Sequence, residues 1–202
     1  MRSDPIPPEP CSLAAQRQML HLAELPGYSP PLFTVAGRRV VRLTEADAPA
    51  LGRLFARCDD YFELLEGRPA GPTAALGQLR DGPVERVPHD LINLGLLGPD
   101  GELAGLIGAL RHHRVPDQWY LGFLLLDPAW RGRGLGSTVY WAFQNWIATQ
   151  GAESIVLAVL AGNTRAHRFW QSLGFGSPRS YPVRQIGLKR HILIEYEKDL
   201  AG

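Results

Sequence analysis

The chain is 202 residues long, which is about the length of one globular domain. Leu, Ile, Val and Phe make up 55 of these residues, or 27%, whereas chains tend to stay disordered below about 20%, so we expect a hydrophobic core. The 21 basic and 20 acidic residues nearly cancel. Because no net charge attracts a polyanion, general binding to nucleic acid is not expected.

Cysteine content and hydropathy indicate the compartment. Only Cys11 and Cys58 are present, which is typical of a reducing compartment and excludes a disulfide framework or a cysteine-based zinc site. The apolar runs, such as residues 121–126, are far shorter than the ~18 residues of a membrane span, and the polar N-terminus lacks an apolar signal core. We therefore predict a cytoplasmic protein with no membrane partner and no metal.

The first part of the chain is predicted as an N-terminal extension over residues 1–37, followed by a domain over residues 38–202. The extension contains a short helix, residues 12–24, which Ser12 can cap. A β-rich run over residues 39–43 begins the domain, and Thr44 can cap the helix that follows to about Cys58. The acidic segment after Cys58 is expected to be a loop, and a second short helix is expected at residues 73–79.

Three antiparallel strands are predicted next. Apolar runs over residues 91–97 and 103–112 flank Gly98-Pro99-Asp100-Gly101, a turn in which Pro fixes φ and Gly accepts a positive φ. A second turn at residues 115–117 leads into a strand over residues 119–126.

The C-terminal part alternates helices and strands. Apolar residues recur at helical spacing over residues 135–150, and Gly151 is placed to end that helix. A buried strand follows at 155–160, and Asn163 or Thr164 caps a helix that Gly174 closes. Strands at 181–188 and 192–197 complete the predicted order βααβββαβαββ.

A glycine-rich loop separates the strand at 119–126 from the helix at 135–150. Its glycines free the backbone to approach a ligand, and the first N–H groups of the helix have no partner within it, so an anion can bind there. A P-loop would need Gly-Lys-Ser/Thr, but no lysine precedes Leu188. A dinucleotide fingerprint would need Gly or Ala at Ser137 and parallel βαβ units. Plain turn residues are the remaining alternative for Gly132, Gly134 and Gly136.

Two motifs separated by one helix and one strand are informative together. They are Arg131-x-x-Gly134-x-Gly136 and Asn163-x-x-Ala166-x-x-Phe169-Trp170-x-x-Leu173-Gly174-Phe175. Both resemble signatures of the GCN5-related N-acetyltransferase (GNAT) superfamily, the first being R/Q-x-x-G-x-G/A, and the resemblance spans residues 38–200. It implies a single-domain bacterial type with an α+β GNAT fold. The implied fold is a mixed, mostly antiparallel sheet of six to seven strands, about four helices, and a splay between strand four (119–126) and strand five (155–160).

The resemblance implies that acetyl-CoA lies in this splay as the acyl donor. Its pantetheine arm would bond to the backbone of strand four and contact Asn163, with Trp170 as a wall of the cleft. The pyrophosphate would lie on the N–H groups of the glycine-rich loop and the helix start, and Arg131 and Arg133 would add charge. The cofactor-binding residues implied are Leu124, Leu125, Leu126, Arg131, Gly132, Arg133, Gly134, Leu135, Gly136, Ser137, Asn163 and Trp170.

The same resemblance implies direct transfer of the acetyl group from the thioester to an amine in a ternary complex. The backbone N–H of Leu124 would donate to the developing oxyanion. A tyrosine that protonates the leaving thiolate in many relatives corresponds to Trp170, whose indole is no acid near neutral pH, so Trp170 is either a wall of the cleft or a core aromatic. A glutamate base on strand four corresponds to Tyr120. By a period of two, Tyr120 shares a face with Gly122 and Leu124, and it is either functional or a packing residue.

The acceptor implied is a primary amine of a small molecule or of a protein N-terminus. In relatives the loop between the first two helices covers the acceptor, and here that loop offers Asp60 and Tyr61 as contacts. A non-catalytic acyl-CoA-binding module is the alternative, because neither the usual tyrosine nor the usual glutamate is present. A nucleic-acid protein that uses Arg131 and Arg133 is a weaker alternative, and a homodimer through a strand edge or the extension is left open.

Overall fold

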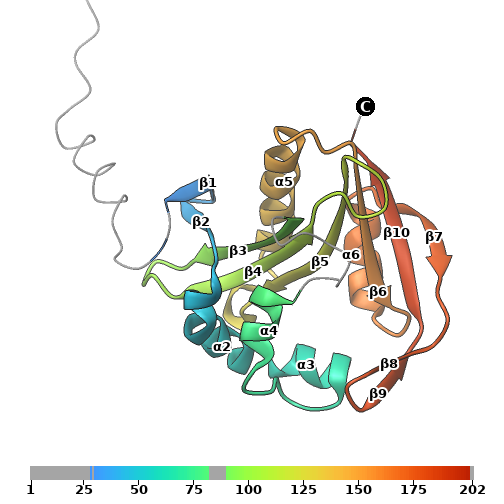
Figure 1. The fold of residues 1–202 in the computed structure, drawn as a ribbon, viewed down its shortest axis with the longest axis horizontal. Coiled ribbons are helices and arrows are strands. Elements are labelled where there is room, and N and C mark those ends of the chain that lie inside the picture. The colour runs from blue at the N-terminus through green and yellow to red at the C-terminus, as the bar shows by residue number, and fades with distance from the viewer. Residues whose placement is uncertain (1–27, 29, 82–89, 201–202) are drawn as a thin grey trace, which may run out of the picture.

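In the computed structural model, residue 28 and residues 30–81 and 90–200 are described, and they form a sheet with helices on both faces (Figure 1). The large sheet has the strand order β1-β2-β3-β4-β5-β6-β10-β7, and β8 and β9 form a separate pair. The strands are β1 (Pro31–Val35), β2 (Arg38–Arg42), β3 (Leu91–Leu97), β4 (Leu103–Leu110), β5 (Gln118–Leu126), β6 (Ser154–Leu160), β7 (Gly176–Ser180), β8 (Arg184–Ile186), β9 (Lys189–His191) and β10 (Leu193–Asp199). The α-helices are α2 (Ala48–Arg57), α3 (Asp59–Glu66), α4 (Ala74–Arg80), α5 (Leu135–Ala148) and α6 (Thr164–Ser172), and short 3₁₀ turns precede α2 (Glu45–Asp47) and α5 (Pro128–Trp130).

The large sheet is mixed and mostly antiparallel. Among the described strands, only β5 and β6 are paired in parallel, and all other neighbours are antiparallel. The α+β class predicted from the sequence is therefore confirmed. The described residues form eight strands in the large sheet, where six to seven were expected, and five α-helices, where about four were expected.

Each face of the sheet carries its own hydrophobic core. On one face α5 and α6 bury Trp119 of β5 together with Phe143 and Trp170. On the other face α2, α3 and α4 bury Leu51 and Phe62 against β2 to β5 (Figure 1). Since helices cover both faces, the central strand β4 is buried at every position, and its sequence is apolar throughout rather than alternating.

The helix expected at residues 135–150 is confirmed as α5. It buries Val139, Tyr140, Phe143 and Ile147, which lie three or four residues apart as helical periodicity requires. The other elements predicted between residues 39 and 174 are confirmed as well, with small shifts at their ends.

Strand β1 is an element that sequence analysis missed. It pairs with β2 through the turn Ala36-Gly37, where φ is 49° and 72°. Two positive φ values suit the two-residue turn whose twist matches antiparallel strands, so Gly37 was the available signal. The sheet therefore begins at Pro31, before the boundary expected at residue 38. The helix expected at residues 12–24 lies outside the described residues.

Two further predictions were wrong. The acidic segment after Cys58 is the helix α3 and not a loop, because Asp59 and Asp60 stabilise its N-terminal turn and Gly67 ends it with a φ of 77°. The strand expected at residues 181–188 is reduced to β8, residues 184–186, which pairs with β9 in a separate hairpin and not with the large sheet. Pro182 cannot donate to a ladder, and the chain turns at Gly187 with a φ of 56°.

Gly105 in β4 allows the close approach of β5. A Cβ added there would lie 2.9 Å from the carbonyl oxygen of Leu125 and 2.7 Å from Cδ2 of Leu126. Gly105→Ala should therefore destabilise the protein by about 1–3 kcal/mol in thermal unfolding. The control Gly71→Ala, where no atom lies within 4 Å of the added Cβ, should change the melting temperature little. Equal melting temperatures for the two variants would contradict this packing.

Candidate active site

The parallel ladder between β5 and β6 is short. It covers four residue pairs, the last of which is Leu121 with Leu157. Beyond this pair β5 continues to Leu126, still paired with β4, and β6 continues to Leu160, still paired with β10. Residues 122–126 of β5 therefore have one edge without a partner strand. Such an edge presents backbone donors and acceptors to a ligand that lies beside it.

A β-bulge at Gly122 changes which way the rest of β5 faces. Gly122 is an extra residue, because the residues on either side of it pair with consecutive residues of β4. An extra residue shifts the alternation of side chains by one position. Tyr120 therefore shares a face with Phe123 and not with Leu124. The expectation that Tyr120 and Leu124 share a face was wrong for this reason.

Tyr120 and Phe123 lie on the face that α2, α3 and α4 cover. The ring of Phe123 meets that of Tyr61 edge-on with centroids 5.6 Å apart, and the ring of Tyr120 lies 4.8 Å from that of His113. A Cβ at Gly122 would lie 3.6 Å from Cε1 of Tyr120, yet Gly122 itself is exposed. The backbone at the bulge is thus exposed at Gly122, and the predicted residues Tyr120 and Tyr61 lie on the same face.

The backbone of Leu124 points to the unpaired edge of β5. The N–H of Asp127 donates to the carbonyl of Ala104 in β4 at 2.9 Å. In an antiparallel pair every second residue turns both backbone groups to its partner, so Leu125 faces β4 while Leu124 and Leu126 face away from it. The N–H of Leu124 has the orientation that an oxyanion donor at this edge needs. The backbone groups of Leu125 face β4 and not this edge, contrary to the expectation that they bond to the pantetheine arm.

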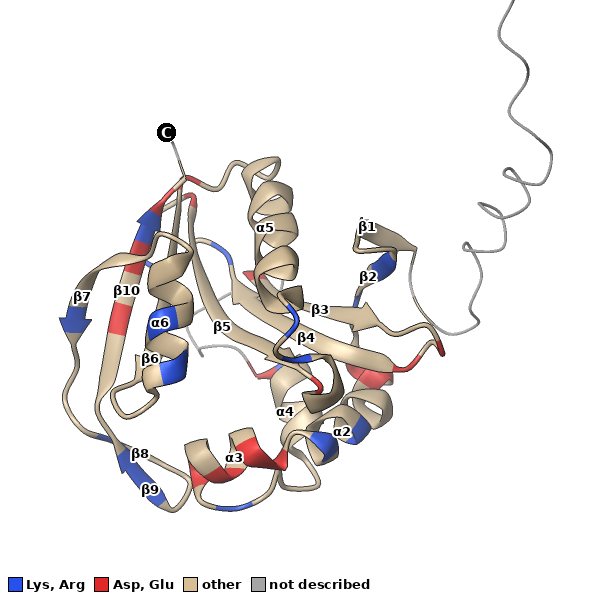
Figure 2. Cartoon of the chain, turned by 180° about the vertical axis from the view of Figure 1, so that it is seen from behind, with Lys and Arg blue, Asp and Glu red and all other residues tan. Residues whose placement is uncertain are grey.

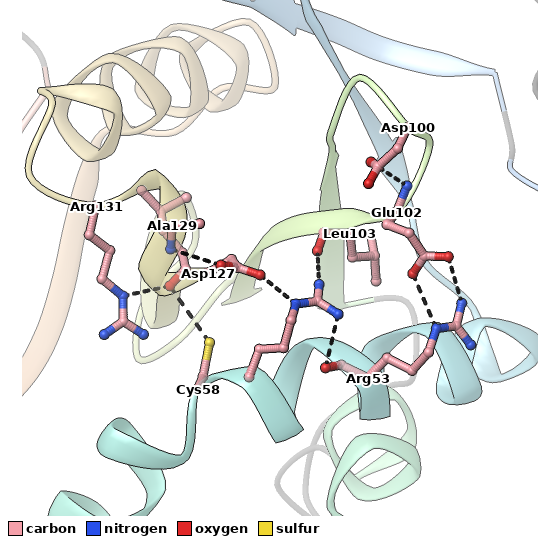
Figure 3. A network of polar contacts seen from close by, with 10 residues as sticks. Arg53, Cys58, Asp100, Glu102, Leu103, Asp127, Ala129 and Arg131 are labelled. Atoms are coloured by element: carbon pink, nitrogen blue, oxygen red, sulfur yellow. Dashed lines mark hydrogen bonds and ion pairs between the residues drawn. The ribbon is translucent and has the colours of Figure 1, made fainter.

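The carbonyl oxygen of Leu126 already has two donors. Nε of Arg131 donates to it at 2.7 Å and Sγ of Cys58 at 3.6 Å (Figure 3). Burial raises the pKa of the Cys58 thiol, so it stays a protonated donor at neutral pH. Arg131 also forms an ion pair with Asp60 of α3. Arg131 and Asp60 thus join the end of β5 to α3. Arg131 was predicted to bind the cofactor and Asp60 to bind the acceptor, but in the structure their side chains bind each other.

The glycine-rich loop leads into the N-terminus of α5. Gly132 and Gly134 have φ values of 79° and 77°, a conformation that favours glycine. The first N–H with a partner inside the helix is that of Thr138, which donates to the carbonyl of Gly134 at 3.2 Å. The N–H groups of residues 135–137 therefore extend from the end of the helix, with exposed Arg133 beside them. This arrangement suits an anionic group.

An ion pair fixes the turn between β5 and α5 against α2. Asp127 is only 8% exposed, accepts from the N–H of Ala129 at 2.9 Å and pairs with Arg57. Arg57 also donates to the carbonyl of Leu103 at 2.7 Å. Burial opposes the charge of Asp127, but the hydrogen bonds from Arg57 and Ala129 outweigh it and hold the pKa of this carboxyl below its usual value. Figure 3 shows Asp127 beside Ala129, Cys58 and Arg131.

The second motif begins and fills α6. Oδ1 of Asn163 accepts from the N–H of Ala166 at 3.1 Å, so Asn163 is the predicted helix cap. Trp170 is 9% exposed, and its ring lies 5.6 Å from that of Tyr140 and 5.4 Å from that of Phe175. Of the two predicted roles of Trp170, the structure supports the core aromatic.

Sequence analysis did not name the pair Arg57 and Asp127. Asp127 had a local signal, since an aspartate before Pro128 is a typical cap of a helical turn. Arg57 had none, because its partner lies 70 residues away along the chain. The bulge at Gly122 had only the glycine itself as a signal.

The described residues contain neither a membrane-spanning helix nor a cluster of metal-binding side chains. No helix in residues 30–81 or 90–200 is long and apolar enough to cross a membrane. No group of three or more His, Cys, Asp or Glu side chains in the same part of the chain is placed to hold a metal ion.

Comparison with known protein families gives one match. The model of the acetyltransferase (GNAT) family matches residues 57–175, which is more than half of the 202-residue chain and includes β5, the glycine-rich loop and α6. The chain therefore belongs to the GNAT acetyltransferase family and is an N-acetyltransferase, as the two motifs predicted. Enzymes of this family use acetyl-CoA as their co-substrate. No curated protein matches this chain in sequence.

Solved structures share the fold at low sequence identity. An acetyltransferase from Thermus thermophilus is 22% identical with a TM-score of 0.65, over 84% of this chain and 99% of that one. The ribosomal-protein-S18-alanine N-acetyltransferase from Escherichia coli is 20% identical with a TM-score of 0.58, over 82% and 95%. The ribosomal-protein-S5-alanine acetyltransferase from Vibrio fischeri is 16% identical with a TM-score of 0.62, over 84% and 96%.

The glycine-rich loop can be tested with two matched substitutions. Gly134→Ala places a side chain where φ is 77°, which costs roughly 1–2 kcal/mol, and should lower both the melting temperature and the affinity for acetyl-CoA. Gly136→Ala lies in the first turn of α5, where the added Cβ would be an ordinary 3.5 Å from the ring of Phe169. It should leave both quantities nearly unchanged. Equal acetyl-CoA affinities for the two variants would argue against the role of the loop backbone.

The pair Arg57–Asp127 predicts a pH dependence of stability. The pKa of Asp127 in the folded state lies below its unfolded value of ~3.9. The pair therefore stabilises the fold fully above pH ~3.9, and this stabilisation is lost as the pH falls through the folded-state pKa. Asp127→Asn should lower the free energy of unfolding by about 1–3 kcal/mol at pH 7, and this difference should shrink below pH ~4. For Glu102→Gln, which breaks an exposed pair with Arg53, we expect at most about 1 kcal/mol in urea unfolding. A pH-independent effect of Asp127→Asn would contradict this account.

Proposed function

We propose that this protein transfers the acetyl group of acetyl-CoA to a primary amine of a small molecule or a protein N-terminus, by direct attack in a ternary complex. The observation that carries the proposal is the unpaired edge of β5, which ends beside the uncapped N-terminus of α5. A strand edge can bond an extended amide-containing arm, and a helix N-terminus favours an anion. In acetyl-CoA the pantetheine is such an amide-containing arm and the pyrophosphate is such an anion. They follow each other along acetyl-CoA in the order in which the strand edge and the helix N-terminus follow each other in the protein.

The donor would bind with its pantetheine arm along residues 122–126 of β5 and its pyrophosphate at residues 132–137. Leu124 supports this placement, because its backbone groups face the unpaired edge. Arg133 is exposed at the helix start and would add positive charge. Arg131 would act indirectly by holding the last carbonyl of β5 and Asp60 of α3.

The chemistry is the replacement of a C–S bond by a C–N bond. The amine nitrogen bonds to the acetyl carbonyl carbon, the sulfur of CoA leaves, and the proton lost by the amine balances the proton that the thiolate takes up. The N–H of Leu124 would stabilise the oxyanion, a contribution of about 3–4 kcal/mol for one such donor. Bringing the two reactants together can contribute roughly 7–11 kcal/mol.

The acceptor would approach on the other face of the sheet, over the bulge. Tyr120 and Tyr61 lie there, and burial raises the pKa of Tyr120 and raises that of Tyr61 to about 12. Both hydroxyls therefore stay protonated at neutral pH and would orient the amine rather than accept its proton. Two similar structures are ribosomal-protein alanine N-acetyltransferases, which is why a protein N-terminus is included among the acceptors.

Thiol release from acetyl-CoA tests this function. The acceptors are amino acids, polyamines, aminoglycosides and short peptides with free N-termini, and we expect release with one class above the rate without acceptor. If acetyl-CoA raises the melting temperature but no acceptor releases thiol, the binding module without turnover replaces the proposed function. If acetyl-CoA does not bind, both are wrong.

Tyr120→Phe tests the acceptor side of the site. Loss of one hydrogen bond that orients the amine should lower kcat about 5- to 30-fold and leave the affinity for acetyl-CoA unchanged. Tyr196→Phe is the control, since this buried tyrosine lies on the opposite face, where its hydroxyl bonds to His167 at 2.8 Å. Unchanged steady-state rates for Tyr120→Phe would show that Tyr120 is a packing residue.

A further inference from the structure

A buried carboxylate lies on the sheet face that carries Tyr120. Glu195 of β10 has a side chain only 8% exposed, and both of its oxygens accept from Arg114, at 2.9 and 2.6 Å. Oε2 also accepts from the hydroxyl of Tyr181 at 2.8 Å. These bonds hold the pKa of Glu195 below its usual value although burial opposes its charge. Glu195 is therefore an ionised anchor for Arg114 and Tyr181.

The strand register places this cluster next to the bulge. Tyr120 of β5 pairs with Val156 of β6, which pairs with Glu197 of β10, and Glu195 lies two residues further along the same strand. Residues two apart on a strand face the same way, so Tyr120 and Glu195 share a face. Neighbouring strands are ~4.8 Å apart and two residues span ~7 Å along a strand, so the backbones of Tyr120 and Glu195 are separated by about 12 Å.

Two more arginines surround this anchor. Nη1 of Arg179 lies 4.0 Å from Oε1 of Glu195, and the guanidinium carbon of Arg184 lies 6.0 Å from the ring centre of Tyr181. Arg184 makes no ion pair with any residue that the structure describes. Burial and the charge of Glu195 raise the pKa of Tyr120, and the charges of Arg184 and Arg114 partly offset this rise.

The charge that faces a ligand here is positive. The guanidinium groups of Arg114 and Arg179 pair with the buried carboxylate of Glu195, and these two side chains are 41% and 68% exposed. The guanidinium of Arg184 lies next to Tyr181, which also bonds to Glu195. Glu197 is the second carboxylate of β10 on this face, and it accepts from Nε2 of Gln118 at 3.0 Å. Figure 2 shows the basic residues along β7, β8 and β9, across from the acidic helix α3.

The β8–β9 hairpin that carries Arg184 is fixed to α3. Nζ of Lys189 donates to the carbonyl of Glu63 at 2.6 Å, and the N–H of Leu188 donates to the carbonyl of Glu66 at 2.7 Å. These two bonds hold the hairpin to the C-terminal turn of α3. The position of Arg184 is therefore set by the fold and does not depend on a flexible loop alone.

We propose that the acceptor amine carries a carboxylate, and that Arg184 is the residue that selects it. This inference rests on the proposed function, because it assigns a substrate class to the acceptor side of that site. A guanidinium suits a carboxylate by its planar, bidentate geometry. The carboxylate can belong to a free amino acid or to an acidic side chain near the N-terminus of a peptide, and the test distinguishes these two sources.

The experiment compares acceptors that differ only in the carboxylate. L-alanine is paired with L-alaninamide, and a Glu-Ala-Ala amide peptide with its Gln-Ala-Ala amide counterpart. For each, kcat/KM is measured by thiol release, and affinity for the protein saturated with CoA is measured by isothermal titration. We expect the acidic member of at least one pair to be favoured, and the pair that responds identifies the source.

Arg184→Gln should remove this preference. Loss of a charged hydrogen-bonding partner should lower kcat/KM for the acidic acceptor roughly 10- to 100-fold, with little effect on the neutral one. Arg53→Gln removes the same charge on α2, from a pair with Glu102, and should leave the preference intact. Thermal melting of both variants checks that they fold.

The outcomes separate this inference from the proposed function. Thiol release with equal or greater preference for neutral acceptors, or an acidic preference that Arg184→Gln leaves intact, would overturn the inference while acetyl transfer stands. Absence of thiol release with every acceptor, together with tighter binding of the acidic ligand that depends on Arg184, would overturn the proposed function and support the carboxylate site. Absence of any acidic preference in both turnover and binding would overturn the inference in either case.

Discussion

The arrangement of the site depends on where the parallel ladder between β5 and β6 ends. Both strands continue beyond Leu121 and Leu157, but each is then bonded to a strand on one side only. A sheet normally satisfies the backbone groups of its inner strands on both sides, so this edge inside the sheet needs another partner. The bulge at Gly122 lies where the ladder ends and sets which side chains of β5 face α3 and which face α5.

Polar contacts hold the segments around this edge in place. Arg57 binds Asp127 at the turn after β5, and Arg131 binds both the carbonyl of Leu126 and the side chain of Asp60. These contacts join α2 and α3 to the end of β5 and to the start of α5. A loop whose glycines accept positive φ can then present its N–H groups in a fixed position, because its two ends are held. The arginine of the first motif has its role here, as a brace between β5 and α3.

The elements that periodicity defines were predictable, and those that depend on distant contacts were not. The apolar spacing of α5 and the two motifs were sufficient for the fold class and the family, since both are local in sequence. The helix α3 was missed because a run of acidic residues is also typical of a solvated loop. The signal for a helix was Gly67, which ends α3 as its C-terminal cap. The orientation of Tyr120 was wrong because a bulge is a property of two paired strands. Arg184 could not be placed next to Tyr181 and Glu195 from sequence, since the β8–β9 hairpin and its contacts with α3 determine its position.

The central claim is that acetyl-CoA bonds to the unpaired edge of β5, and amide hydrogen exchange measured by NMR tests it residue by residue. Saturation with acetyl-CoA should slow exchange at the N–H of Leu124 and at residues 132–137. Exchange at Phe123 and Leu125 should change little, because their N–H groups already face β4. Binding of acetyl-CoA without slower exchange at Leu124 would contradict the account.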